Sequence, residues 1–232
     1  LPGFQNVKSP TDQLGEAEKY CRAAVRLNPA MARAHNNLGL VLKDQNRIGE
    51  ASASFREAIK TNPQLAEAHY NLGLCQGKDG QLDQAMTSFQ EALRCKPEYA
   101  EAGNDLGLML MARKQHEQAV ASFRQALRGK PDNAEIHNNL GTALMGLRQF
   151  SVATKHFRRA VEIRPDFAAA YNNLGNALLD QDDFRSLYDE AENCYRTALQ
   201  HAPDMVDAHF NLGICLQPQG KYPQALECFQ RT

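Results

Sequence analysis

The chain has 232 residues and a formal net charge of -1, with 43% hydrophobic and 23% charged residues. This composition is typical of a globular chain and not of a disordered one. The near-zero net charge argues against bulk nucleic acid or an anionic membrane as a partner, and no apolar run reaches the roughly 18 residues of a bilayer-spanning helix.

The N-terminal residues come before any repeated pattern. We expect residues 1–10 to be a poorly ordered or irregular extension, because the repeat described next begins near Thr11. The chain starts with Leu1 instead of methionine and has no signal-peptide region, so we expect it to be part of a longer protein.

From Thr11 onward, several residue types recur at intervals of 34 residues, with a last interval of 38. The Leu-Gly pairs begin at Leu38, Leu72, Leu106, Leu140, Leu174 and Leu212. The prolines are Pro29, Pro63, Pro97, Pro131, Pro165 and Pro203. An Ala-aromatic-Ala set contributes the rings of Phe55, Phe89, Phe123, Phe157, Tyr195 and Phe229. A period in this range indicates an array of stacked repeats.

The spacing within one unit predicts two helices. In the first, helix A, the Leu-Gly glycine is tolerable if a neighbour passes too close for a Cβ. In the second, helix B, the alanines lie four residues before and three after the aromatic, so all three share one face. The proline ends helix B. We expect Asp132, Asp166 and Asp204, which follow their prolines, to cap the next helix A.

This pattern resembles the tetratricopeptide repeat, a pair of antiparallel helices. The resemblance implies an all-α fold, a right-handed superhelix of stacked helix pairs. We expect one solenoid over 11–232: helix B of a partial repeat at 11–31, full repeats at 32–65, 66–99, 100–133, 134–167 and 168–205, and a truncated repeat at 206–232. The truncated end lacks a polar capping helix, so the uncapped termini are expected to allow end-to-end self-association.

Two departures interrupt the repeat. Four extra residues lie near 184–188, and they form either a tolerated loop insertion or a binding protrusion that presents Phe184 or Leu187. The other departure is Pro218, late in the last helix A, where we expect the helix to end early or to kink.

In the family that the chain resembles, helix A lines the concave surface of the superhelix. The residue before each Leu-Gly pair is asparagine in five repeats and Asp105 in the sixth. The asparagines are Asn37, Asn71, Asn139, Asn173 and Asn211. They resemble the asparagine ladder in the repeat array of O-linked N-acetylglucosamine transferases, which holds protein substrates by their main chain. Asp105 breaks this ladder, which argues against binding through the third full repeat. The alternative is that each asparagine bonds a neighbouring helix or loop.

Further residues of helix A complete the expected peptide-binding face. The residues one position earlier that we assign to it are Asn36, Tyr70, Asn104, Asn138 and Asn172. Four residues before the ladder position lie Glu67, Glu101 and Glu135, which suggest a preference for basic residues in the partner. A solvated acidic helix face is the alternative. The ladder position holds no Lys or Arg, which argues against the carboxylate clamp of chaperone cofactors.

The sequence shows no catalytic or metal-binding motif. Four histidines share one position of helix A: His35, His69, His137 and His209. Equivalent positions of stacked repeats lie too far apart to share a metal ion, so we interpret these histidines as packing residues. Most of the six cysteines occupy repeat positions, which predicts burial and favours a reducing compartment such as the cytoplasm. We therefore expect no catalytic residues, metal or cofactor.

The predicted function is a protein-interaction scaffold that binds an extended protein or peptide segment in the groove lined by the A helices. One alternative is the substrate-recruiting arm of a larger enzyme, such as a protein glycosyltransferase, and another is a self-assembling array. Lys and Arg are interleaved with acids, so no nucleic-acid partner is expected, and no direct membrane insertion.

Overall fold

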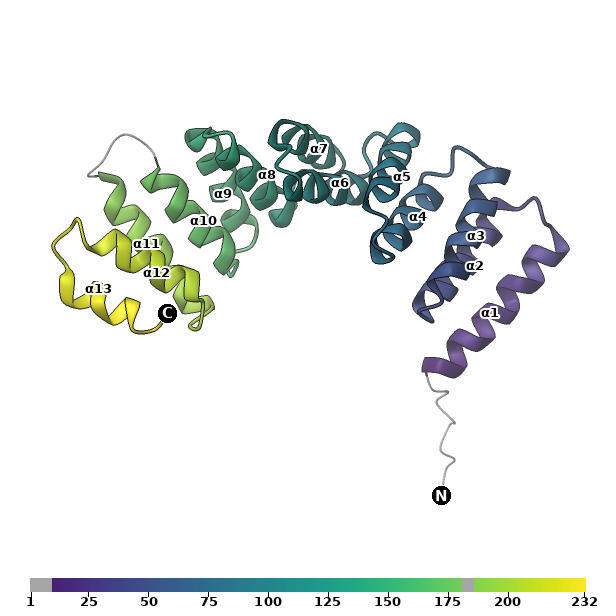
Figure 1. Cartoon of the computed structure of the whole chain (residues 1–232), viewed down its shortest axis with the longest axis horizontal. Helices are drawn as coiled ribbons and strands as arrows, with labels where there is room; N and C mark the ends of the chain where they lie inside the picture. Colours follow the sequence, from purple (N-terminus) through teal and green to yellow (C-terminus); the bar gives the residue numbers. More distant parts are fainter. Residues whose placement is uncertain (1–9, 181–185) are drawn as a thin grey trace, which may run out of the picture. The chain divides into compact units, whose positions relative to one another are not determined.

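The computed structural model describes residues 10–180 and 186–232, and these residues are helical without strands. The helices are α1 (Pro10–Leu27), α2 (Ala32–Asp44), α3 (Ile48–Thr61), α4 (Ala66–Lys78), α5 (Leu82–Cys95), α6 (Ala100–Ala112), α7 (His116–Gly129), α8 (Ala134–Gly146), α9 (Phe150–Ile163), α10 (Ala168–Leu179), α11 (Ser186–His201), α12 (Val206–Leu216) and α13 (Tyr222–Phe229). The all-α prediction is confirmed, and Figure 1 shows the consecutive helix pairs. The even-numbered helices are the A helices, and the odd-numbered ones are the B helices.

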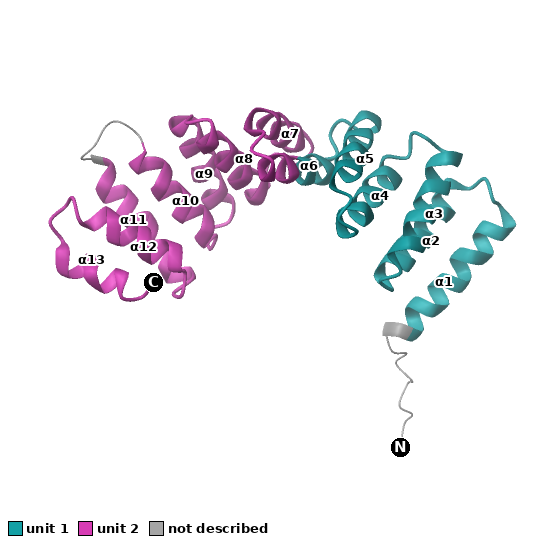
Figure 2. Ribbon diagram, in the orientation of Figure 1, with its two compact units in different colours: residues 1–106 teal, residues 107–232 magenta. Residues whose placement is uncertain are grey.

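The chain divides into two compact units, coloured separately in Figure 2. Unit 1 covers residues 1–106 and unit 2 covers residues 107–232. In unit 1, α2 packs between α1 and α3, and α4 packs against α3 and α5. In unit 2, each helix from α7 to α13 packs against the next one in sequence. Each unit is therefore a stack of antiparallel helix pairs.

The Leu-Gly glycines fix how helix A meets helix B of the same repeat. A Cβ built on Gly39 would lie 2.5 Å from the ring of Phe55, and one on Gly141 would lie 2.6 Å from Phe157. Both rings are fully buried. The close approach expected at this position is confirmed, and the neighbour that excludes a side chain is the aromatic ring of helix B.

Two local predictions have clear outcomes. Helix α12 ends at Leu216, two residues before Pro218, as expected. The prediction that the aspartates cap the A helices is wrong: Asn133 caps α8 by accepting a hydrogen bond from the backbone N–H of Ile136 at 3.0 Å. Asp132 instead accepts a hydrogen bond from Arg159 at 2.6 Å, and Asn133, which follows it, is the extended residue before the helix begins.

The two unusual segments are described only in part. Residues 1–9 of the expected extension, and residues 181–185 with Phe184, lie outside the described residues. Helix α11 begins at Ser186 and has 16 residues, against 14 in α9. Leu187 lies half-buried in its first turn. Within the two described ranges, each helix is too short or too polar to cross a membrane.

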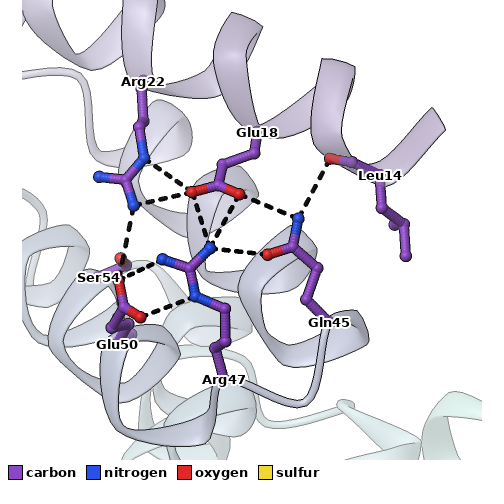
Figure 3. Close-up of polar contacts among 7 residues, drawn as sticks. All are labelled: Leu14, Glu18, Arg22, Gln45, Arg47, Glu50 and Ser54. Atoms are coloured by element: carbon purple, nitrogen blue, oxygen red, sulfur yellow. Dashed lines mark hydrogen bonds and ion pairs between the residues drawn. The ribbon is translucent and has the colours of Figure 1, made fainter. Parts of the chain in front are cut away.

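A polar cluster joins α1 to the next repeat in unit 1. Glu18 accepts hydrogen bonds from Arg22 at 2.9 Å, from Gln45 at 3.0 Å and from Arg47 at 2.9 Å, as Figure 3 shows. Arg47 also binds Glu50 at 2.6 Å. The hydrogen bonds from Gln45, Arg22 and Arg47 lower the pKa of Glu18 to about 2.

Unit 2 contains the same arrangement between α11 and the turn before α13. Glu192 accepts hydrogen bonds from Arg196 at 2.9 Å and from Lys221 at 2.7 Å. Arg196 also donates to Gln224 at 3.3 Å. Burial by itself would raise the pKa of Glu192, but the hydrogen bonds from Lys221 and Arg196 outweigh it and lower the pKa. Glu18 and Glu192 both lie three residues before the central position of helix B, so the repeat register places both clusters.

Candidate functional site

The residues expected to bind a ligand lie on A helices, and the side chains of several of them hydrogen-bond across neighbouring repeats. The Nδ2 of Asn71 on α4 donates to the Oδ1 of Asn36 on α2 at 3.1 Å. In unit 2, Asn173 on α10 donates to Asn138 on α8 at 3.0 Å, and Asn211 on α12 donates to Asn172 on α10 at 3.0 Å. We call each of these side-chain pairs a rung. A ladder residue thus donates to the residue one position earlier in the preceding A helix.

The rungs satisfy only part of each carboxamide. An amide side chain has two N–H donors and one oxygen with two lone pairs, and a rung uses one donor of one partner and one lone pair of the other. Accessibility then separates the members. Asn36, Asn71 and Asn172 are buried. Asn104, Asn138, Asn139, Asn173 and Asn211 are half-buried, and Asn37 is exposed. The half-buried and exposed members keep polar atoms within reach of a ligand.

The rung between α4 and α6 runs in the opposite direction. The hydroxyl of Tyr70 donates to the Oδ2 of Asp105 at 2.9 Å, and the Nδ2 of Asn104 donates to Oδ1 at 3.3 Å. A carboxylate cannot donate, so the residue of the preceding helix must supply the proton. A rung therefore also forms at Asp105, because Tyr70 replaces asparagine at the partner position and supplies the donor.

Aromatic rings surround this reversed rung. The ring of Tyr70 lies 5.6 Å from Phe89 and 5.0 Å from Tyr99, measured between centroids. The Nζ of Lys96 lies 5.0 Å from the centroid of the Tyr99 ring. Burial raises the pKa of Tyr70, and Asp105 raises it further. Tyr99 was not among the predicted site residues, although its place directly before an A helix could have indicated that it lies beside the face.

The glutamates expected on this face have different surroundings. Glu67 on α4 is exposed, and Glu101 on α6 is half-buried. Glu135 on α8 binds Arg164 at 3.0 Å, and the Arg164 guanidinium lies over the ring of Phe167. The carboxylate of Glu135 is therefore matched by a cation of unit 2.

The last A helix of unit 2 adds an apolar surface beside its rung. Phe210 and Ile214 lie one turn apart on α12 and are 49% and 43% exposed. Phe210 contacts the ring of Phe229 edge-on at 5.9 Å. In the preceding repeats these two positions hold Asn172 and Asn176 or Asn138 and Thr142. The row of A helices in unit 2 therefore passes from polar on α8 and α10 to apolar on α12.

The repeated histidines bond to the backbone. In each case Nε2 donates at 2.9 Å to the carbonyl of the proline six residues earlier, as His35 does to Pro29. His137 also lies with its Nδ1 3.0 Å from the Nδ1 of His156. Burial lowers the pKa of His137, and burial together with His137 lowers that of His156 to about 4. The described residues contain no group of three or more His, Cys, Asp or Glu placed to hold a metal ion.

The cysteines that occupy repeat positions in the core are poor nucleophiles. Cys75, Cys194 and Cys215 are buried. Burial raises the pKa of Cys194 to about 12 and that of Cys215 to about 11. A thiol needs a lowered pKa to react as thiolate near neutral pH. These three cysteines therefore serve packing.

The fold and the rungs define a helical-repeat protein in which, within each unit, the A helices of neighbouring hairpins are joined by polar side chains. The chain belongs to the tetratricopeptide repeat family. One model, described as a TPR repeat, matches residues 41–80, 107–147 and 149–182. Two tetratricopeptide repeat models match residues 66–99, and residues 12–51 and 185–232. Proteins of this family generally mediate protein–protein interaction.

Solved structures share the fold at low sequence identity. YrrB, described as a TPR protein with an unusual peptide-binding site, is 22% identical, with a TM-score of 0.73 over 83% of this chain and 97% of its own. MamA is also 22% identical, with a TM-score of 0.63 over 69% of this chain and 91% of its own. PilF of Pseudomonas aeruginosa is 18% identical, with a TM-score of 0.69 over 85% and 88%. No curated protein matches the chain.

Proposed function

We propose that this chain is a non-enzymatic scaffold that binds an extended segment of a partner protein along the A helices of its repeats. The observation that carries the proposal is the row of rungs in unit 2. Half-buried carboxamides of Asn138, Asn173 and Asn211 lie on three successive A helices, and the last of these helices also carries the exposed apolar side chains of Phe210 and Ile214. A carboxamide offers both a donor and an acceptor, which matches a peptide group, and the apolar pair offers a contact for a hydrophobic side chain.

The asparagines serve the scaffold and the ligand with different atoms. The rung of Asn173 to Asn138 uses one N–H and one oxygen lone pair, so the other N–H of Asn173 and its oxygen are available for a main chain that lies across it. The neighbour YrrB is described as having a peptide-binding site, which supports peptide binding as a use of this architecture.

The test begins with peptides selected from a displayed library of random 12-residue sequences against the whole chain. Their dissociation constants are measured by fluorescence polarisation for the wild type and for the variant Asn173→Ala/Asn211→Ala. Two lost hydrogen bonds are expected to weaken binding about tenfold. The matched control is Asn193→Ala, which changes an exposed asparagine on the B helix α11. Equal affinities of the double variant and the control contradict the proposal.

The Asn211→Ala substitution leaves the buried oxygen of Asn172 without its donor, which can lower the stability of the fold. A second variant therefore changes exposed side chains only. Phe210→Ser/Ile214→Ser changes two exposed side chains and is expected to weaken peptides that carry a hydrophobic residue. Circular dichroism melting curves check that each variant is folded. Full affinity in this second variant removes α12 from the proposed face.

The other functions considered from the sequence remain predictions. A substrate-recruiting arm of a larger enzyme, as in the glycosyltransferase arrays whose asparagine ladder this chain resembles, uses the same face. A full-length sequence separates it from a pure scaffold. End-to-end self-association is checked by light scattering over a concentration series, where a constant monomer mass contradicts it.

A further inference from the structure

We propose that the reversed rung of Tyr70 and Asp105 in unit 1 recognises a cationic side chain of the bound segment, and arginine in particular. The inference rests on the proposed function, because it names the residue that the face of A helices accepts in unit 1. It assigns Asp105 the role of ion-pair partner, and Tyr70 and Tyr99 the role of aromatic walls.

The first argument is the missing counter-charge of Asp105. Its two oxygens accept hydrogen bonds from Tyr70 and Asn104, which are both neutral donors. Within residues 10–180 and 186–232, no lysine, arginine or histidine forms an ion pair with it. Each carboxylate oxygen has a further lone pair. The half-buried carboxylate can therefore still accept both N–H groups of a guanidinium.

Two other carboxylates with little exposure have cationic partners among the described residues of the chain, unlike Asp105. The side chains of Glu18 and Glu192 are 17% and 12% exposed, and each binds two cationic side chains. Partial burial of a carboxylate is costly unless a cation compensates it. Asp105 has the burial without the cation. A cation from a partner supplies what the chain itself provides at the other two sites.

The second argument is the set of aromatic and acidic groups around the rung. The rings of Tyr70 and Tyr99 lie 5.0 Å apart at an angle of 50°. Lys96 already places its ammonium 5.0 Å from the Tyr99 ring, which shows that this ring accepts a cation. Glu67 lies one turn before Tyr70 on α4 and is exposed. Burial raises the pKa of Tyr99 to about 12, and Glu101, Glu67 and Asp105 also raise it, as a negative potential requires.

Arginine fits this site better than lysine for reasons of geometry. A guanidinium is planar, so it binds a carboxylate through two parallel N–H groups and stacks on an aromatic ring. The neutral rungs lack this preference, because a carboxamide pair such as Asn71 with Asn36 has no net charge. The reversed rung therefore gives unit 1 a selective position in a row of otherwise neutral ones.

The experiment uses the whole chain and two capped tripeptides, N-acetyl-Ala-Arg-Ala-amide and its citrulline analogue. Citrulline keeps the shape and most hydrogen bonds of arginine but has no charge. Nitrogen–proton correlation spectra follow each titration. We expect the arginine peptide to shift resonances of α4 and the start of α6, and to bind about tenfold more tightly than the citrulline peptide. The lysine analogue is expected to bind with intermediate affinity.

The decisive variant is Asp105→Asn, which installs the residue that the other repeats carry at this position. It is therefore expected to fold, and to bind the two peptides equally. The matched control is Glu135→Gln in unit 2, whose carboxylate already has Arg164 as its partner. This control is expected to keep the preference for arginine.

Two outcomes overturn the inference: equal binding of the arginine and citrulline peptides to the wild type, or an unchanged arginine preference in Asp105→Asn. Both outcomes are separable from failure of the proposed function, which is tested with other peptides and with variants of unit 2. A tripeptide is too short to need the whole row of A helices, so its binding reports on the reversed rung alone.

Discussion

The rungs of unit 1 and unit 2 join the same two positions of neighbouring A helices, but they differ in the side chains at those positions. In unit 2, Asn173 and Asn211 each donate to an asparagine of the preceding A helix. In unit 1, Asn71 does the same, but the next rung pairs Tyr70 with Asp105 and reverses the donor. The repeat therefore determines which two positions meet. The residues at those positions determine the direction of the hydrogen bond and the charge that the face presents.

The histidine position differs between the units in a similar way. In unit 2, His137 faces His156 on helix B. In unit 1, the positions equivalent to His156 hold Ser54 and Ser88, in the repeats of His35 and His69 respectively. Since His137 donates through Nε2 to Pro131, its Nδ1 accepts from the N–H of His156. Protonation of both rings would leave two donors facing each other, so unit 2 is expected to be the more acid-sensitive unit.

The largest effect is expected for the variant His156→Ser, which gives unit 2 the residue of unit 1 and tests the difference in acid sensitivity. The pKa of His156 is lowered to about 4, by burial and by His137. A lowered histidine pKa means stability that is present above pH 6.5 and lost as the pH falls through 4. Between pH 7 and pH 4, the free energy of unfolding is expected to fall by about 1–2 kcal/mol less in the variant than in the wild type. Urea unfolding between pH 7 and pH 4 measures it, and parallel curves for the two proteins refute the expectation.

The next effect compares the two polar clusters through Glu18→Gln and Glu192→Gln. Each substitution is expected to lower the free energy of unfolding by about 1 kcal/mol at pH 7, since both carboxylates bind two cations in partly exposed positions. Glu57→Gln, an exposed residue with a single ion pair to Lys60, is the control and is expected to have almost no effect.

The acid dependence of the same variants sharpens the comparison. The pKa of Glu18 falls from 4.5 to about 2, so its stabilisation is fully present above pH 4.5 and disappears as the pH falls through 2. The difference between the wild type and Glu18→Gln is therefore expected to persist at pH 3.5. If the difference in the free energy of unfolding has vanished by pH 4, the hydrogen bonds of Figure 3 do not keep Glu18 ionised in solution.

The smallest expected effect is a gain in stability for Asp105→Asn. Burial raises the pKa of Asp105 above 3.8, in spite of the hydrogen bonds from Tyr70 and Asn104. A raised carboxyl pKa favours the fold below pH 3.8 and weakens it as the pH rises past the folded value. At pH 7 the free energy of unfolding of the neutral variant is expected to be roughly 0.5–1 kcal/mol larger than that of the wild type. A less stable variant indicates that the charge already has a partner in the free protein.

Much of the fold was predictable because the same residue types return in register. The Leu-Gly pairs predicted a close approach, and Gly39 against Phe55 confirms it. Pro218 predicted an early end of α12, which stops at Leu216. The predicted aspartate caps failed because the extended segment continues to Asn133, and an aspartate one residue earlier is drawn to Arg159. A cap depends on the backbone of a single residue, which the repeat pattern does not specify.

The sequence by itself determined the helix pairs, their order and the positions that face a neighbouring repeat, because a regular period of apolar and small residues leaves one way to stack. Only the tertiary structure decided that a ladder asparagine donates to the asparagine one position before the ladder position of the preceding A helix. It also decided that Tyr70 supplies the donor for the rung at Asp105, and that Tyr99 lies against Tyr70. These contacts join residues about one repeat apart in the chain. Their partners depend on side-chain orientation across two helices, which no pattern within one helix contains.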